Sequence, residues 1–437
     1  MSEVEKKAKN AEKASLELSN ISREIRKDAL EAAASAIKKK EKEILEANEK
    51  DVLKAEKLLK KGEYTKAFVD RLRIDENKIQ KIADMINSVA ELEDPLHKTL
   101  SARELDEDLK LYKISTPIGV IGSIFESRPD VLPQISSLCL KSGNSVILKG
   151  GSEADGSNKI LYETIKEATE EAGIPEGWIQ LMRARKEVKE LLKLDKHVDL
   201  LVPRGSENFI NFIQDNSRIP VLGHAKGLCH TYVDKEADLD KAVRISYDAK
   251  VQYPAVCNAT ETLLVHKEIA EEFLPKIHEK YLEAEVEVRG CPKTKNILEE
   301  IKLADEEDWK TEYLDLIISI KIVDEMDEAI DHINKYGSKH TDSIISENGN
   351  RTLKFLERVD SSSVMANAST RFSDGYRYGL GAEVGISTGK IHARGPVGLK
   401  GLTTYKYYLI GDGHVVSSYA GPDSKQFTHK EISEKLS

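Results

Sequence analysis

The residue best suited to covalent chemistry is Cys257, in the segment Tyr-Pro-Ala-Val-Cys-Asn-Ala-Thr-Glu-Thr. It lies between an expected helix that ends near Lys250 and an expected strand that begins near Thr262, and such loops commonly carry catalytic groups. A thiolate attacks acyl carbons, and backbone N–H groups beside it can stabilise the resulting oxyanion. A free cysteine is also often a small buried apolar residue, so Cys257 alone leaves both interpretations open.

Two further segments could bind an anionic cofactor. Val-Pro-Arg-Gly-Ser at 202–206 follows an apolar run and precedes an expected helix, whose N-terminus would offer N–H groups to a phosphate. The alternative is an ordinary turn in which Ser206 caps the helix. Lys149 ends a second apolar run, before Gly150 and Gly151. That position faces the crevice in which α/β sheets bind nucleotides, unless Lys149 is simply a surface lysine.

Several common cofactor and metal motifs are absent from the sequence. There is no GxGxxG, GxxxxGK[ST] or HExxH, and the 11 histidines and 4 cysteines show no zinc-ligand spacing. We therefore expect no metal. Gly385-Ile-Ser-Thr-Gly389 matches the GxSxG of serine hydrolases, but that motif requires a helix after the serine. The sequence that follows, Lys-Ile-His-Ala-Arg-Gly-Pro, is not helical, so we expect no nucleophile at Ser387.

The composition is that of a large soluble globular protein. The chain has 437 residues, of which 40% are apolar and 32% charged, and 66 Lys and Arg against 76 Asp and Glu give a net charge of −10. A net acidic chain is a poor candidate for binding nucleic acid, which requires a basic face. The sequence contains no run of about 18 apolar residues, so it predicts no membrane span. The N-terminal segment has no apolar signal region, and no CxxC pair occurs, so we expect free thiols and a cytoplasmic location. Cys139 and Cys229 lie in apolar segments typical of buried thiols, and Cys291 in a polar loop.

Periodicity predicts the elements that must position these residues. Residues 1–97 show apolar residues at helical spacing, between faces rich in Lys and Glu. From about residue 98, short apolar strands alternate with helices, which is the pattern of parallel α/β sheets. The expected strands are 111–114, 119–125, 145–149, 198–202, 229–234, 262–266, 317–323 and 343–346, and the expected helices are 133–141, 158–172, 206–214, 239–250, 269–283, 325–336 and 351–359.

This alternation predicts a division into domains. We expect a first α/β domain at 1–227, made of the N-terminal helices and a parallel sheet, and a second α/β domain, which carries the cysteine, at 228–375. Residues 376–437 would return to the first domain and form an oligomerisation tail. The apolar run 402–410 could pair with another subunit or within its own sheet, and both possibilities stay open.

Ordered sequence blocks accompany these residues. Around Cys257 the block is Pro-x-x-Cys-Asn-x-x-Glu-Thr, and the others are TPIGVIGSIFESRPD at 116–130, LKGGSEA at 148–154, VPRG at 202–205, NASTRF at 367–372, GLGAEVGIS at 379–387 and HARGP at 392–396. Together they resemble the γ-glutamyl phosphate reductase family, also called glutamate-5-semialdehyde dehydrogenases, of the aldehyde dehydrogenase superfamily. The resemblance implies an aldehyde-dehydrogenase-like α/β fold, with a Rossmann-type cofactor domain, an α/β catalytic domain and a small oligomerisation element.

The resemblance also implies a reaction and its cysteine. The family reduces L-glutamyl 5-phosphate with NADPH to L-glutamate 5-semialdehyde and phosphate, in proline biosynthesis, and Cys257 would form a thioester on the way. Ordinary aldehyde dehydrogenases have a glutamate base in a Glu-Leu-Gly-Gly-Lys-like stretch, but Leu-Gly-His-Ala-Lys at 222–226 has no carboxylate. A reductase gains by excluding water from the thioester. Arg128 replaces the superfamily's oxyanion-binding asparagine and would bind either the leaving phosphate or the oxyanion. Asn258, next to the cysteine, is a further candidate catalytic residue.

Binding roles follow from the same resemblance. Lys149 would bind the adenosine ribose or its 2′-phosphate, Gly205 and Ser206 the pyrophosphate, and Glu383 the nicotinamide ribose. The substrate needs cations for its phosphate and α-carboxylate and an acceptor for its amine. The candidates are Asn367, Ser369, Thr370, Arg371 and Arg394, each of which could instead support a loop.

The resemblance implies partners and leaves alternatives. We expect a homo-oligomer, a dimer or tetramer, and a separate glutamate kinase that hands over its labile product. One alternative is a phosphate-independent aldehyde dehydrogenase that oxidises a semialdehyde, against which the missing glutamate base argues. Another is a non-catalytic scaffold of the same fold, against which the retention of Cys257, Lys149 and Glu383 argues.

Overall fold

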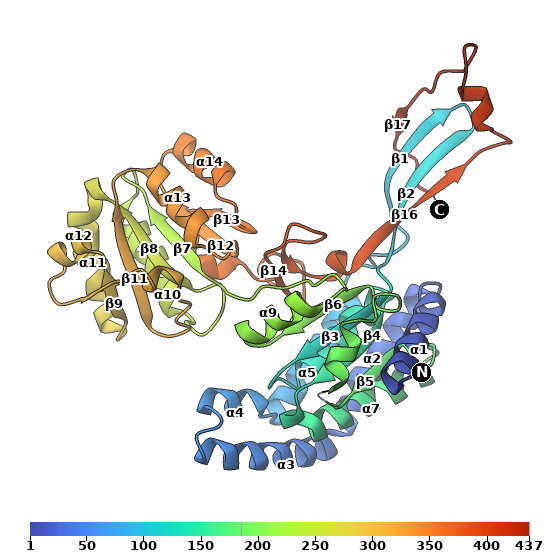
Figure 1. The fold of residues 1–437 in the computed structure, drawn as a ribbon, viewed down its shortest axis with the longest axis horizontal. Helices are drawn as coiled ribbons and strands as arrows, with labels where there is room; N and C mark the ends of the chain where they lie inside the picture. The colour runs from blue at the N-terminus through green and yellow to red at the C-terminus, as the bar shows by residue number, and fades with distance from the viewer. Residues whose placement is uncertain (185, 437) are drawn as a thin grey trace. The chain divides into compact units, whose positions relative to one another are not determined.

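The computed structural model describes residues 1–184 and 186–436, which form two compact units (Figure 1). The first comprises Met1–Val221, Gly381–Val384 and Gly398–Ser437, and the second comprises Leu222–Leu380 and Gly385–Val397. These limits differ from the predicted domain ranges at residues 222–227, 376–380 and 385–397, which all belong to the second unit. Residues 222–227 belong to the second unit because they pack on its cysteine loop, and residues 385–397 because they pair and bond within that unit.

The N-terminal part of the first unit is helical, as the periodicity predicts. In the last of these helices Ile79, Ile82 and Ile86 are buried at helical spacing. Asp75 begins that helix by accepting a hydrogen bond from the Lys78 N–H at 2.7 Å. The helices are α1 (Glu3–Leu18), α2 (Arg23–Lys39), α3 (Glu41–Lys60), α4 (Lys66–Leu72) and α5 (Glu76–Glu91).

A parallel sheet with the strand order β5-β4-β3-β6 follows these helices. Since β4 and β5 extend from one side of β3 and β6 from the other, the strand order reverses between β3 and β6, a topological switch point. Strands β3, β4 and β6 were predicted from the sequence. Strand β5 was not predicted, because it has only four residues. The elements are β3 (Val120–Phe125), α6 (Val131–Lys141), β4 (Ser145–Gly150), α7 (Asp155–Glu171), β5 (Ile179–Met182), α8 (Lys186–Leu191), β6 (Leu200–Arg204) and α9 (Glu207–Asn216).

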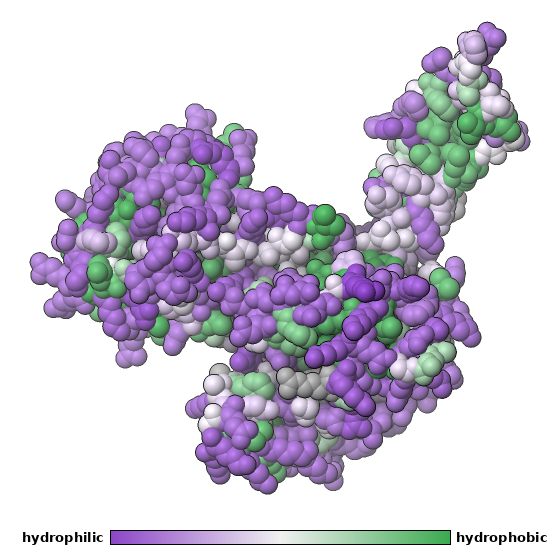
Figure 2. Space-filling model, in the orientation of Figure 1, coloured by the Kyte–Doolittle hydropathy of each residue, from purple (hydrophilic) through white to green (hydrophobic). Residues whose placement is uncertain are grey.

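A second sheet of the first unit is antiparallel and has the order β16-β2-β1-β17. The apolar run predicted at 402–410 is β16 (Thr403–Ile410), and one of its edges pairs with β2 (Leu109–Pro117) of its own chain. As an edge strand it exposes Tyr407, Leu409 and Ile410, each at least 48% exposed, and Figure 2 shows apolar side chains gathered over this sheet. The other edge of β16 has no strand beside it within the described chain, so pairing with another subunit stays a prediction. The other strands are β1 (Thr99–Asp106) and β17 (Lys430–Ile432).

The second unit contains a parallel sheet with the order β10-β9-β11-β8-β7-β12-β13. Its central strands are buried on both faces: Leu263 and Val265 of β8 pack in one apolar cluster, and Leu264 between them packs in another. The strands are β7 (Cys229–Val233), β8 (Thr260–His266), β9 (Glu287–Gly290), β10 (Lys302–Leu303), β11 (Ile317–Val323), β12 (Thr341–Ile345) and β13 (Ser363–Ala366), and the helices are α10 (Leu239–Val251), α11 (Lys267–Glu283), α12 (Pro292–Ile297), α13 (Met326–Tyr336) and α14 (Gly349–Arg358).

The GxSxG segment is part of a two-stranded antiparallel ladder and not of a nucleophile elbow. Strand β14 (Gly385–Ser387) pairs with β15 (Gly395–Val397), and no helix lies between them in this described segment. The segment therefore lacks the helix that the hydrolase motif requires after its serine. No helix within residues 1–184 and 186–436 is long and apolar enough to cross a membrane.

Candidate active site

Cys257 lies in the loop between α10 and β8, where the sequence predicts it. It is partly exposed, whereas the other three cysteines are buried, including Cys291, which the sequence placed in a polar loop. Cys291 is buried because it begins α12 and packs in the core of the second unit. The Ala259 N–H donates to the Val256 carbonyl at 3.1 Å, which folds the loop into a tight turn around the cysteine. Among the four thiols, Cys257 is the one that a substrate can reach.

A buried ion pair closes this loop at its base. Lys250, in the last turn of α10, donates to a carboxylate oxygen of Glu261 in β8 at 2.6 Å, and both side chains are at most 1% exposed. Burial raises the pKa of Glu261 and lowers the pKa of Lys250, because each charge has lost its water. The other oxygen of Glu261 accepts from the Leu314 N–H at 3.2 Å. The pair fixes the end of α10 to the start of β8, and with them both ends of the loop.

Close packing against the backbone of Cys257 requires a glycine at position 227. A Cβ at Gly227 would lie 2.1 Å from the Cys257 carbonyl oxygen and 2.5 Å from its Cα. Side chains are not accommodated at such distances in a packed interior. Gly227 thus allows the segment 222–227 to lie against the nucleophile loop.

Two imidazole rings lie beside the sulfur of Cys257. A ring nitrogen of His224, a ring nitrogen of His340 and the Cys257 Sγ are all within 4.8 Å of one another. The two rings meet edge to face, with centroids 4.8 Å apart. His224 Nδ1 lies 2.7 Å from the Ile386 carbonyl oxygen, so Nδ1 carries the proton and Nε2 the lone pair. Neither histidine could be assigned a role from the sequence, because positions 224 and 340 meet only through the fold.

Cys229 supports the nucleophile loop from the adjacent strand, β7. Its thiol donates to the Cys257 carbonyl at 3.2 Å and lies 3.6 Å from His340 Nδ1. Burial is the main reason that the pKa of Cys229 lies well above its ordinary value. The prediction that Cys229 is a buried thiol is confirmed, and its contacts show that it positions the loop as a neutral donor.

Three other predicted site residues also meet this loop. The Thr370 hydroxyl donates to the Asn258 carbonyl at 2.7 Å, and the Asn258 side-chain amide donates to the Ser373 carbonyl at 2.8 Å. Arg371 is 7% exposed, and its Nε donates to Gln252 at 2.9 Å. Burial lowers the pKa of Arg371, and the Cys257 sulfur acts in the opposite direction. The guanidinium of Arg371 therefore lies within electrostatic reach of the Cys257 sulfur.

Predicted cofactor residues lie at the carboxyl edge of the parallel sheet in the first unit. Lys149 is near the end of β4, is 5% exposed, and donates to the Gly150 carbonyl. Arg204 at the end of β6 donates to the Val384 carbonyl, which brings the neighbouring Glu383 to the same edge. Nucleotides bind at this edge in open α/β sheets.

The switch point between β3 and β6 has the chemistry of an anion site. The Ser206 N–H, at the N-terminus of α9, donates to the Glu126 carboxylate at 3.3 Å, so this helix end binds a negative group of the protein itself. A Cβ at Gly205 would lie 2.6 Å from Glu126 Oε2 and 2.7 Å from the Phe209 ring, so a larger residue there would displace these side chains. A buried lysine, a glycine turn and a helix N-terminus at one edge fit a phosphate-bearing dinucleotide.

Known proteins share this sequence and fold over nearly their whole length. The sequence profile of the aldehyde dehydrogenase family matches residues 1–295. The γ-glutamyl phosphate reductases of Natronomonas pharaonis and Methanosarcina mazei are 61% and 56% identical over 98% and 99% of this chain, and the match covers 98% of each relative. The crystal structure of γ-glutamyl phosphate reductase from Thermotoga maritima matches with a TM-score of 0.92 at 44% identity, covering 95% of this chain and 100% of that chain. The chain belongs to the aldehyde dehydrogenase family, in its γ-glutamyl phosphate reductase branch.

Family membership makes the chain an oxidoreductase and bears out the predicted fold class. It does not by itself assign the remaining substrate candidates, whose side chains have partners within the protein. Asn367 exchanges two hydrogen bonds with the backbone of Ser346, at 3.0 and 2.9 Å. Ser369 accepts from the N–H two residues on, at 3.3 Å. Arg394 pairs with Asp360 at 3.1 Å. These contacts support loops, and a substrate role for the three residues stays a prediction.

Arg128, the predicted phosphate ligand, lies in the turn between β3 and α6 and is half-buried. The preceding Ser127 has φ 49° and donates its N–H to the Glu153 carboxylate at 2.6 Å. That bond holds the turn in a conformation that few residues other than glycine adopt. The turn that carries Arg128 is thus held in place. That Arg128 binds the leaving phosphate or the oxyanion at the acyl carbon stays a prediction.

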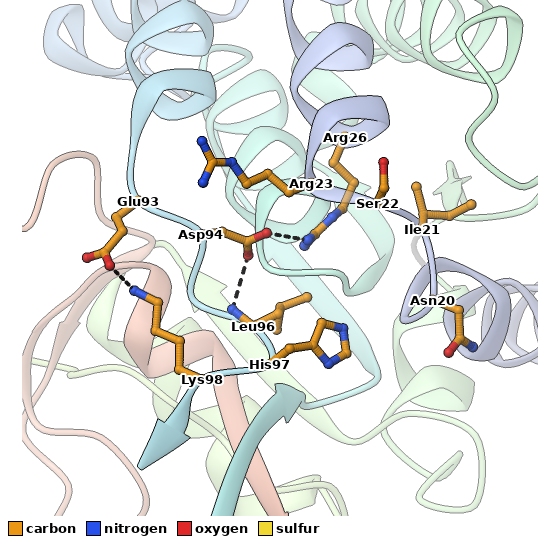
Figure 3. A pocket seen from close by; sticks show the side chains of 10 residues that line it. All are labelled: Asn20, Ile21, Ser22, Arg23, Arg26, Glu93, Asp94, Leu96, His97 and Lys98. Carbon is orange, nitrogen blue, oxygen red and sulfur yellow. Dashed lines mark hydrogen bonds and ion pairs between the residues drawn. The ribbon is translucent and has the colours of Figure 1, made fainter. Parts of the chain in front are cut away.

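A separate open cavity of about 380 Å³ in the first unit contains none of the predicted site residues (Figure 3). Its lining residues are Asn20, Ile21, Ser22, Arg23, Arg26, Glu93, Asp94, Leu96, His97 and Lys98. Arg26 donates to Asp94 at 2.6 Å, and Glu93 pairs with Lys98, so four of its charged side chains neutralise one another in pairs.

Proposed function

We propose that this chain reduces L-glutamyl 5-phosphate to L-glutamate 5-semialdehyde with NADPH and releases phosphate, as a step of proline biosynthesis. The observation that carries the proposal is the accessible Cys257 held beside imidazoles and a buried guanidinium, in a chain 61% identical to a γ-glutamyl phosphate reductase. A thiolate is the nucleophile that such an acyl phosphate needs.

In the first half of the reaction, Cys257 attacks the acyl carbon of the substrate. His224 Nε2, whose lone pair is fixed by the proton on Nδ1, accepts the thiol proton. Arg371 stabilises the thiolate, and backbone N–H groups of the loop hold the oxyanion. Arg128 binds the leaving phosphate by two parallel hydrogen bonds. Inorganic phosphate departs, and a glutamyl thioester remains on Cys257.

In the second half, the thioester carbon receives a hydride, which is the chemistry that NADPH supplies when bound. Lys149 would hold the ribose or its 2′-phosphate, the N-terminus of α9 at Gly205 and Ser206 the pyrophosphate, and Glu383 the nicotinamide ribose. The tetrahedral centre then collapses to the aldehyde, and the sulfur leaves as thiolate and regains its proton from His224.

One specific observation favours a second candidate, an aldehyde dehydrogenase that hydrolyses the thioester. The sequence lacks a glutamate base, but the fold brings His224 and His340 within 4.8 Å of Cys257. An imidazole can activate water as well as accept a thiol proton. The two functions differ in the acyl acceptor, which is phosphate in one and water in the other.

The deciding experiment measures NADP⁺ reduction with glutamate 5-semialdehyde, with and without inorganic phosphate. The native chain is expected to need phosphate, and Cys257→Ala is expected to lose at least about 10³-fold in kcat. Cys291→Ala, which removes a buried thiol of the same unit, serves as the matched control and keeps the activity. Equal rates without phosphate would establish the hydrolytic enzyme instead, and full activity in Cys257→Ala would remove the cysteine from the mechanism.

We further propose that the enzyme is a homo-oligomer in the cytoplasm and receives its substrate from a glutamate kinase. The exposed apolar edge strand β16 supports self-association, because such an edge pairs readily with a second copy. Four free thiols suit a reducing compartment. Replacing Tyr407 and Leu409 by Lys is expected to yield monomers in sedimentation experiments, and an unchanged mass would place the interface elsewhere.

A further inference from the structure

The cluster around Cys257 contains the donor set of a transition-metal site. One sulfur and two imidazole nitrogens lie within 4.8 Å of one another, in Cys257, His224 and His340. In a tetrahedral zinc site, bonds of about 2.3 Å to sulfur and 2.0–2.1 Å to nitrogen separate the ligand atoms by about 3.3–3.6 Å. The three atoms must therefore approach one another by at most about 1.5 Å to bind a zinc ion, and the Cys257 and His224 side chains are only half-buried.

A second observation points to a ligand at this place. His340 is fully buried, and its Nε2 has no hydrogen-bond partner among the residues that the structure describes. Its other nitrogen, Nδ1, lies 2.9 Å from the Thr341 hydroxyl, which can accept the ring proton and leave the lone pair on Nε2. A buried polar atom without a partner is costly, and coordination to a cation would satisfy it.

The outer contacts of both rings are those of metal ligands. Metal-binding histidines donate their second N–H to a carbonyl or hydroxyl, which fixes the ring and the tautomer. His224 Nδ1 does this toward the Ile386 carbonyl at 2.7 Å, and His340 Nδ1 can do so toward Thr341. Exposure differs across the cluster, since His340 is buried while Cys257 and His224 are partly exposed. A cation could therefore reach the cluster from the side of Cys257 and His224, while His340 would bind it from the protein interior.

We propose that Cys257, His224 and His340 bind one thiophilic divalent cation of the Zn²⁺ class, which reversibly blocks the nucleophile. Thiolate and imidazole together select zinc over the oxygen-seeking cations Mg²⁺ and Ca²⁺. Binding releases the thiol proton and leaves the fourth position to water. The binding itself is independent of the proposed function, whereas the inhibition rests on it.

The test measures binding of Zn²⁺ alone to the reduced full-length chain by competition with a chromophoric chelator. The native chain is expected to bind one equivalent, with affinity lowered at least about 10-fold, or 1.4 kcal/mol, in Cys257→Ser and in His224→Gln. His278→Gln, which changes a half-buried histidine of the same unit, is the matched control and keeps the native affinity. Co²⁺ should give a thiolate charge-transfer band in the native chain and not in Cys257→Ser.

Two readouts separate this proposal from the reductase activity. Zn²⁺ should protect Cys257 from iodoacetamide, found by peptide mapping, and a chelator should restore alkylation. Affinity unchanged in both Cys257→Ser and His224→Gln would overturn the metal site, whether or not the chain reduces glutamyl phosphate. One-equivalent binding in a chain without reductase activity would keep the site and overturn only the proposed reaction. Circular dichroism of each variant establishes that a lost affinity is not a lost fold.

Discussion

The carboxyl edge of the sheet in the first unit and the nucleophile loop of the second differ in how their polar groups are assembled. At the first, Lys149 lies near the end of strand β4 and Ser206 follows strand β6, so two strands of one parallel sheet bring them to one edge. At the second, Cys257 meets His224, which comes earlier in the chain, and His340, which comes much later. The first region follows from strand order, and the second depends on packing between distant segments.

This difference predicts where each region is vulnerable. The cofactor edge uses backbone N–H groups and single side chains on the surface of a regular sheet, so a change there should affect binding more than folding. The nucleophile loop is held by a buried ion pair, a glycine contact and a buried thiol. Changes to those supports should affect stability and chemistry together.

The largest expected effect breaks the support of the loop. Lys250→Met leaves the buried Glu261 carboxylate without its partner and should lower the free energy of unfolding by about 3–5 kcal/mol, measured by urea denaturation. The double variant Lys250→Met with Glu261→Leu should recover most of that loss. Lys98→Met, at the exposed ion pair with Glu93 in the first unit, should cost less than about 1 kcal/mol. Equal losses at the two pairs would contradict the contrast between the regions.

The next effect concerns the close approach to Cys257. Gly227→Ala places a methyl group 2.1 Å from the Cys257 carbonyl oxygen, so the loop must shift. Unfolding free energy should fall by about 1–3 kcal/mol. Because the sulfur moves with its backbone, kcat should fall at least about 10-fold. Gly349→Ala, where no atom lies within 4 Å of the added methyl, should leave both unchanged. Native kcat in Gly227→Ala would show that the segment can yield without moving the nucleophile.

A change at the cofactor edge should separate binding from chemistry. Lys149→Met removes the buried ammonium and should raise KM for NADPH about 10-fold, or 1.4 kcal/mol, with the rate of Cys257 alkylation unchanged. Steady-state kinetics and iodoacetamide labelling measure the two quantities. Lys159→Met on the exposed face of α7 provides the control. A slower alkylation in Lys149→Met would mean that the two regions are not independent.

The smallest effect is a pH dependence away from both sites. Hydrogen bonds from Lys390 first, and then from Arg394, lower the pKa of Asp360 from 3.8 to about 2. A carboxyl whose folded pKa is depressed stabilises the fold above its unfolded pKa and loses that effect as pH falls toward about 2. Asp360→Asn should therefore lower stability by less than about 1 kcal/mol at pH 7, because Lys390 is exposed and Asp360 and Arg394 are still partly in contact with water. The difference from the native chain should shrink below pH 4 in urea denaturation, and a constant difference would refute the shift.

Local patterns in the sequence were enough to find most elements of the fold. Strands β3, β4, β7, β8 and β11 are apolar runs bounded by turn residues, and the structure confirms them. The strands that were not predicted are short or polar. Strand β1, Thr-Leu-Ser-Ala-Arg-Glu-Leu-Asp, carries charges along an antiparallel sheet and shows no apolar run. Pairing with β2 and β17 creates that strand, and pairing partners are not a local property.

The residues of the candidate site also divide into those that local sequence reveals and those that only the fold brings together. Cys257 could be singled out because its loop, proline and flanking elements are all local. Thr370 and Arg371 were named from a sequence block, and the structure brings them to the loop. The two histidines could not be found, because no spacing pattern links residues 224, 257 and 340 until β7, β8 and β12 lie side by side.

The measurement that tests the central claim most directly is the capture of the acyl enzyme. The native chain is incubated with glutamate 5-semialdehyde and NADP⁺ without phosphate, quenched in acid, and analysed by intact mass and peptide mapping. The account predicts a glutamyl adduct on Cys257 that accumulates without phosphate, disappears when phosphate is added, and is absent in Cys257→Ala. An enzyme that turns over with phosphate but carries no adduct, or carries it on another residue, would contradict the thioester at Cys257.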